Sequence, residues 1–313
     1  MTLADVIATY VTLRQSMGCR FTTSQYRLQA FCRAVGPDRE MQDVDRDRVL
    51  AFLGPPVTRN WHGKYSTLTC FYRYAISRGH VRASPLPTTV PKVPSRFVPY
   101  IYTREDIQRL LDATTSYRRL NRLFEPHTFR AVLLLLYGAG LRISEALALR
   151  MADVDLSESL LLIRDTKFYK SRHVPIGASL TQAMQDYVAA RHTAGHTDEP
   201  DAPFFVGRKG APLTIHTVQR SFRQLRAHAG VRRSGGARDQ PRLHDCRHAF
   251  AVNRLVTWYQ AGADVSRLLP KLSTYLGHLD LSSTQHYLTM TPALLQEAGT
   301  RFERYAMGGS AHD

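Results

Sequence analysis

A single tyrosine near the C-terminus follows a short motif suited to binding phosphate. Leu276-Gly277-His278 is followed, after eight further residues, by Tyr287. A tyrosine hydroxyl acts as a nucleophile when neighbouring groups activate it. Upstream the chain carries further basic or imidazole side chains that suit the same chemistry: Arg142, Lys167, His244 and Arg247. These residue types together predict that the tyrosine attacks a phosphodiester and that the reaction needs no metal ion.

The segment Gly138-Ala-Gly-Leu-Arg142-Ile-Ser-Glu145 predicts the end of one helix and the start of another. Backbone N–H groups at a helix start favour an anion. Arg142 adds a planar, two-pronged donor that matches two phosphate oxygens. We interpret Glu145 as a first-turn carboxylate that favours the positive end of this helix.

His244 and Arg247 are three residues apart, so a helix presents both on one face. Together they offer an imidazole and a guanidinium to one phosphate. We interpret His248 as structural. A metal held by His244 and His248 is disfavoured because no third ligand lies nearby in the sequence.

Two short strands are predicted at residues 160–163 and 173–176, with a polar turn between them. The turn holds Lys167, Lys170 and Arg172. A lysine at this tip can give a proton to a leaving oxygen. Lys170 fits that role by position, but Lys167 comes sooner after the strand and is preferred.

Tyr287 needs positive surroundings, because a tyrosine pKa is ordinarily near 10. Ser282 and Gln285 have the spacing of a capping box. They predict a short helix that carries Tyr287, and His278 is placed to hydrogen-bond the attacked phosphate.

The fold class predicted is mainly α with a small β-sheet. Apolar spacing predicts helices throughout residues 1–83 and, farther on, at residues 105–113, 129–138, 180–191, 215–229, 244–259, 265–276 and 292–305. Pro270 is expected to break or kink the helix at 265–276. Five prolines between residues 85 and 99 mark a linker. We therefore predict domains at 1–84 and 101–313, joined by residues 85–100.

The formal net charge of +16 favours a polyanionic partner, with double-stranded DNA foremost. Residues 1–99 hold 14 Lys or Arg against 6 Asp or Glu, and the remainder holds 28 against 20, so both domains carry +8. Two basic domains suit a clamp around a duplex. Candidate DNA contacts are Arg59, Asn60, Lys64, Tyr65, Lys92, Arg96, Lys170 and Arg172.

The four cysteines show no C-x-x-C pair, and the N-terminus lacks a signal-peptide pattern. No apolar run is long enough to span a membrane. We expect a reducing, cytoplasmic location in association with the nucleoid, and no membrane partner.

The order Gly-Leu-Arg142, Lys167, His244-x-x-Arg247, Leu-Gly-His278, Tyr287 resembles the tyrosine recombinase (phage integrase) family, which includes Xer, Cre and phage lambda integrase. The resemblance covers roughly residues 100–305. Residues 1–84 are similar, more weakly, to the family's core-binding domain. The segments around Trp258 and Leu288 resemble recombinases of mobile elements that encode several recombinases.

The resemblance implies that Arg142, Arg247, His244 and His278 contact the scissile phosphate, that Lys167 is the general acid and that Tyr287 is the nucleophile. It implies a 3′-phosphotyrosyl intermediate, no cofactor, and a tetramer on two sites, made of one chain or shared with sister recombinases. The outcome would be integration, excision or transposition. Ala139 and Cys246 depart from the family's common residues without touching the chemistry, and the segment before Leu276 is longer than in Xer.

Three alternatives remain open on the sequence. A type IB topoisomerase uses the same kind of site, although the short helical N-terminal domain favours recombination. A sequence-specific DNA-binding protein without catalysis is disfavoured because the six catalytic positions are filled. A metal-dependent nuclease needs converging carboxylates, and the sequence shows no such cluster.

Overall fold

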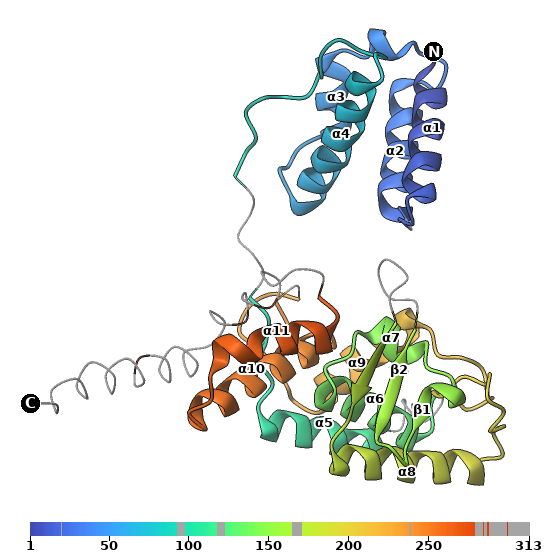
Figure 1. Ribbon diagram of the computed structural model, residues 1–313, viewed down its shortest axis with the longest axis vertical. Helices are drawn as coiled ribbons and strands as arrows, with labels where there is room; N and C mark the ends of the chain where they lie inside the picture. Colours follow the sequence, from blue (N-terminus) through green and yellow to red (C-terminus); the bar gives the residue numbers. More distant parts are fainter. Residues whose placement is uncertain are drawn as a thin grey trace, which may run out of the picture. The chain divides into compact units, whose positions relative to one another are not determined.

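The computed structural model describes residues 1–19, 21–92, 98–117, 123–164, 171–237 and 239–278, together with residues 284, 287 and 299. The chain separates into two compact units, Met1–Arg96 and Phe97–Asp313. Both are built mainly of helices (Figure 1). Each has buried apolar residues of its own, so each is described by itself.

The first unit is helical, as its apolar spacing predicts. Its helices are α1 (Leu3–Ser16), α2 (Thr22–Val35), α3 (Arg46–Leu53) and α4 (Arg59–Ser77), with a 3-10 turn at Met41–Asp43. The side chains of Thr2, Asp45 and Thr58 accept the first N–H groups of α1, α3 and α4. Phe31 and Phe71 are fully buried at the centre of this unit.

The proline-rich segment begins against the first unit. The Tyr65 hydroxyl donates a hydrogen bond to the Pro87 carbonyl at 2.9 Å. Leu86 packs against the same core as α4. Residues 85–92 form neither helix nor strand, because proline lacks the N–H that either element needs.

The second unit combines helices with a small sheet. Its helices are α5 (Arg104–Ser116), α6 (Pro126–Gly138), α7 (Ile143–Leu147), α8 (Ala178–Thr193), α9 (Ile215–His228), α10 (Asp245–Gln260) and α11 (Val265–Leu276). These bounds confirm the helices predicted between residues 105 and 276 to within a few residues. The helix expected at 292–305 lies outside the described residues.

The sheet of the second unit has the order β1-β2-β3 and is antiparallel. Its strands are β1 (Val154–Asp155), β2 (Leu160–Ile163) and β3 (Arg172–Pro175). Leu161 pairs with Val174, and both are buried in the core of this unit. The two predicted strands are confirmed, whereas β1 was missed because two residues show no alternation.

Helix α11 runs unbroken from Val265 to Leu276 with Pro270 inside it. The expectation of a break at Pro270 is therefore wrong. Asp264 accepts the N–H of Arg267 and so caps the helix start. The apolar face of α11 packs with residues of α10. This packing outweighs the one backbone hydrogen bond that proline removes, since tertiary contacts supply most helix stability.

Gly140 lies in the turn that joins α6 to α7, at φ +62°. A Cβ at this position would lie 2.9 Å from Cγ of Phe250, on α10. The turn therefore needs glycine twice, for its left-handed backbone and for the close approach of α10. In the ranges that the structure describes, no helix is both long and apolar enough to cross a bilayer.

Replacing Gly140 with alanine should destabilise the protein more than the same change at Gly262. Gly262 also has positive φ, +68°, but a Cβ there would meet nothing within 4 Å. We expect Gly140→Ala to lower the free energy of unfolding by about 2–5 kcal/mol, and Gly262→Ala by about 1–2 kcal/mol. Urea denaturation measures both. Equal losses would show that contact with α10 contributes nothing.

Candidate active site

Three segments that are distant in the sequence meet around α7. Arg142 immediately precedes α7, and Glu145 lies in its first turn. Arg247 lies in the first turn of α10, and His244 immediately precedes that helix. Gly277 ends α11 in the left-handed conformation, at φ +66°. Short helices and their ends thus deliver the polar groups, while the apolar faces of α6, α10 and α11 stay in the core.

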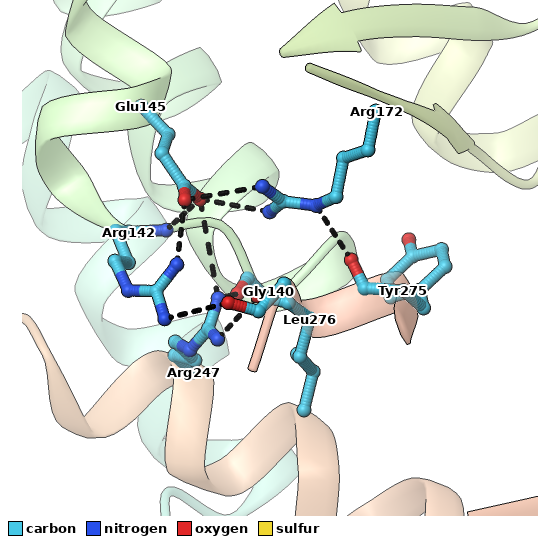
Figure 2. A network of polar contacts seen from close by, with 8 residues as sticks. Gly140, Arg142, Glu145, Arg172, Arg247, Tyr275 and Leu276 are labelled. Atoms are coloured by element: carbon cyan, nitrogen blue, oxygen red, sulfur yellow. Dashed lines mark hydrogen bonds and ion pairs between the residues drawn. The ribbon is translucent and has the colours of Figure 1, made fainter. Parts of the chain in front are cut away.

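Glu145 is the centre of the polar network. Its carboxylate accepts hydrogen bonds from Arg142 Nη1 at 2.7 Å and from Arg172 Nη1 and Nη2 at 3.2 and 2.9 Å. Arg247 Nη1 lies 4.0 Å from it. The carboxylate also accepts the backbone N–H of Arg142 at 3.0 Å. Figure 2 shows the three guanidinium groups converging on this one side chain.

Backbone carbonyls hold the two predicted phosphate-binding arginines from the other side. Arg247 donates to the carbonyls of Gly140 at 2.8 Å and Leu276 at 2.6 Å, and its side chain is 2% exposed. Arg142 Nη2 donates to the Gly277 carbonyl at 3.1 Å. The arginines therefore join the α6–α7 turn to the end of α11 (Figure 2).

The network carries an excess of positive charge. Burial alone would raise the pKa of Glu145, but hydrogen bonds and charge from Arg172, and then from Arg142, lower it to about 2. Burial, followed by the charge of Arg142, lowers the pKa of Arg247 to about 10. At neutral pH the carboxylate is thus ionised and Arg247 remains protonated. Three guanidinium groups around one carboxylate favour a further anion.

Tyr287 lies directly against this network. Its ring stacks on His278, with centroids 5.9 Å apart, and meets the edge of His248 at 5.4 Å. The guanidinium of Arg247 is the charged group with the largest effect on Tyr287, which is 3% exposed. Burial raises the pKa of Tyr287, and the charge of Arg247 and then Arg142 offset this only in part.

The imidazoles around Tyr287 are held by their own contacts. The ring of His244 lies 5.0 Å from that of His248. Burial, followed by the charge of Arg247, lowers the pKa of His244, so this imidazole is neutral at pH 7. Nδ1 of His278 lies 2.7 Å from Oγ1 of the fully buried Thr284. Thr284 was missed by the sequence reading, because no local pattern indicates which hydroxyl will reach His278.

Comparisons with known proteins find relatives that match most of the chain. The Phage integrase family matches residues 101–293. A candidate integrase/recombinase of Sinorhizobium fredii (strain NBRC 101917 / NGR234) is 36% identical over 312 residues, which cover 97% of this chain and 98% of that protein. The tyrosine recombinase XerC of Chlorobaculum tepidum is 31% identical over 310 residues, which cover 90% of this chain and 87% of that protein.

This chain belongs to the phage integrase family. It is a tyrosine recombinase. Its fold is also that of the Tn1549 transposon integrase solved with transposon right end DNA, with a TM-score of 0.71 at 16% identity over 98% of this chain and 100% of that one. The likeness at this low identity concerns the fold alone.

The structure brings together five of the six residues expected to be catalytic in the recombinase: Arg142, His244, Arg247, His278 and Tyr287. Lys167 and Lys170 lie outside the described residues. Glu145 does cap the start of α7, as expected. Its role as the common partner of three arginines was missed, because two of them, Arg172 and Arg247, are remote from it in the sequence.

The prediction for Arg172 needs correction. We expected it in the turn between the strands, as a DNA contact. It is instead the first residue of β3 and pairs with Ile163. Its side chain is 12% exposed and is directed to Glu145 and the Tyr275 carbonyl. The first residue of so short a strand is set by its hydrogen bonds to the neighbouring strand, and the residue types alone do not show where those bonds begin.

The expected DNA contacts of the first unit fall into two groups. Arg59, Asn60 and Lys92 are exposed. The Lys64 ammonium donates to the Phe52 carbonyl at 2.6 Å, and the Tyr65 hydroxyl is bonded to Pro87. The polar atoms of this second pair therefore serve the unit's own packing. Arg96 lies outside the described residues.

No group of three or more His, Cys, Asp or Glu suited to hold a metal ion occurs among the described residues of the recombinase. The carboxylate of Glu145, in the middle of the site, is ion-paired with the guanidinium groups of Arg142 and Arg172.

The low pKa of Glu145 predicts an acid-dependent loss of stability. A carboxyl with a depressed folded-state pKa stabilises the fold above its ordinary pKa and loses that contribution as pH falls toward the depressed value. Between about pH 5 and pH 2 the wild type should lose on the order of 3 kcal/mol through this group.

Glu145→Gln should lack this component of the pH dependence. It should also be less stable at pH 7, because it leaves buried arginines without their counter-charge. Denaturant unfolding of both proteins across this pH range measures the difference. A gap between wild type and variant that stays constant from pH 7 to pH 2 would contradict the assignment.

Proposed function

We propose that this tyrosine recombinase breaks a DNA strand with Tyr287 and rejoins it to a partner strand. The observation that carries the proposal is the position of Tyr287. Its phenol ring is stacked on that of His278 and lies within the electrostatic influence of Arg247, at the edge of a cluster where guanidinium groups outnumber carboxylates. A phosphodiester is the anion that a tyrosine nucleophile in such surroundings would attack.

The arginines and imidazoles supply the electrostatic part of the reaction. Negative charge grows on the non-bridging oxygens as the phenol oxygen bonds to phosphorus, and donors already held in place stabilise it. Arg142, with a side chain 34% exposed, is the first guanidinium that an incoming phosphate meets. His244 and His278 complete the donor set, and neutral imidazole still provides one N–H.

The covalent step needs no added energy source, because one phosphate ester bond replaces another. The Tyr287 oxygen forms a bond to phosphorus and the 5′-oxygen leaves. The phenol proton goes to solvent, and Lys167, which lies outside the described residues, gives a proton to the 5′-oxygen. The ester to tyrosine keeps the energy of the broken bond, so a 5′-hydroxyl of the partner strand can reverse the step.

Tyr287 must move for a phosphate to reach Arg247. Both side chains are nearly inaccessible, at 3% and 2% exposure. The raised pKa of Tyr287 keeps its phenol neutral at pH 7 in this position. We propose that phosphate binding at Arg142 displaces the phenol from Arg247 and turns its oxygen toward the phosphorus.

The two units divide the work in this proposal. The first unit, with Arg59, Asn60 and Lys92 exposed, is the core-binding domain, and the second is the catalytic domain. The partner is double-stranded DNA in the cytoplasm, at the nucleoid. Exchange between two duplexes needs four strand cuts, so four subunits act on a pair of sites. The relatives are named as recombinases and integrases, which favours strand exchange over relaxation by a topoisomerase.

A covalent trap in a bacterial host tests this function. DNA should remain attached to wild-type protein after denaturation, and Tyr287→Phe should carry none, because phenylalanine has no nucleophilic oxygen. Tyr137→Phe is the matched control, since its hydroxyl contacts Asn253 away from the site, and it should trap DNA like wild type. Equal DNA on the Tyr287→Phe protein would contradict a phosphotyrosyl mechanism.

A further inference from the structure

Arg172 joins the sheet to both halves of the active site. It is the first residue of β3, yet its side chain reaches α7 and the end of α11. Nη1 and Nη2 each donate to a different oxygen of Glu145, at 3.2 and 2.9 Å. Nε donates to the Tyr275 carbonyl at 2.9 Å. Figure 2 shows this side chain opposite Arg142, with Glu145 between them.

Gly277 fits closely against the Arg172 guanidinium. A Cβ at Gly277 would lie 2.8 Å from Nη1 and 2.9 Å from Cζ of Arg172. On its other side Gly277 offers its carbonyl to Arg142. The glycine before His278 therefore lies between two guanidinium groups. Its left-handed backbone and this contact both require the absence of a side chain.

The two bonds from Arg172 add to those of Arg142, whose Nη1 and backbone N–H bind the same two oxygens of Glu145 from the other side. The last torsion of a glutamate side chain is a soft one, so the carboxylate is held more firmly by partners on both sides than by one. A guanidinium that spans both oxygens restricts this torsion, and its planar fork does so better than an ammonium can. The orientation matters because the same oxygens face Arg142 and Arg247.

We propose that Arg172 is a positioning residue, which holds the Glu145 carboxylate and the end of α11 so that Arg142, Arg247 and His278 converge on one phosphate. The inference rests on the proposed function of that cluster. It replaces the reading of Arg172 as a DNA contact, because its donors are directed inward and its side chain is 12% exposed.

Single-turnover cleavage tests the proposal. The probe is the DNA recovered from the wild-type covalent trap, prepared as a nicked duplex so that the released fragment diffuses away and the adduct accumulates. At saturating DNA, Arg172→Met should form the adduct roughly 100-fold more slowly, the scale expected from a small misplacement of reacting groups. The Kd for the same DNA should stay within about threefold of wild type, since the altered residue does not touch DNA.

Arg172→Lys keeps the charge and separates the two effects of the arginine. It should also cleave slowly, because one ammonium does not span both Glu145 oxygens. Full recovery by lysine would overturn the proposal, as would a wild-type rate for Arg172→Met. Weaker DNA binding with a normal rate at saturation would assign Arg172 to DNA contact instead.

A double-mutant cycle tests whether Arg172 acts through Glu145. The variant with both Arg172→Met and Glu145→Gln should be no slower, within about threefold, than the slower single variant, because residues in one network are not additive. Rates that multiply would show independent action and overturn the proposal.

Arg191→Met controls for the loss of a buried arginine in the same unit. Arg191 is 1% exposed, pairs with Asp198 at 2.6 Å and bonds the Pro203 carbonyl, away from the site. It should lower the unfolding temperature and leave the cleavage rate per folded molecule unchanged. Wild type that forms no adduct would refute the proposed function itself, whereas a slow Arg172→Met beside an active wild type bears on Arg172 alone.

Discussion

The site depends on one buried carboxylate that must satisfy several guanidinium groups at once. Glu145 has two oxygens, and Arg142 and Arg172 bind them directly while Arg247 lies at 4.0 Å. Removing a partner from a buried ionic network commonly costs about 3–5 kcal/mol. The carboxylate thus keeps the arginines in place, and its single charge leaves the excess that a phosphate can neutralise.

The backbone around this network serves the same requirement. Gly140 and Leu276 offer carbonyls to Arg247, and Gly277 offers one to Arg142. Carbonyls at a turn and at a helix end are available because no helical N–H takes them. The left-handed glycines at positions 140 and 277 are therefore part of the site and not only of the fold. The larger helices and the sheet supply the rigid core from which these ends project.

The sequence predicts the fold class and most helices, because apolar spacing reflects which face a helix buries. It also predicts a set of candidate catalytic residues, since tyrosine, arginine and histidine in this order suit phosphate, and the structure brings five of the six together. It does not predict how the arginines are held. Arg172 is 27 residues from Glu145, and Arg247 is 107 residues from Gly140. Such pairings depend on how distant segments pack. The two-residue strand β1 and the continuous helix through Pro270 depend on tertiary packing in the same way.

The most direct measurement is a crystal structure of the protein joined to DNA at Tyr287. We expect that Glu145 still bridges Arg142 and Arg172, that Arg142 and Arg247 each donate to a non-bridging oxygen of the phosphotyrosine, and that Arg172 stays away from the phosphate. A structure in which Glu145 has separated from the arginines, or in which Arg172 itself binds the phosphate, would contradict it.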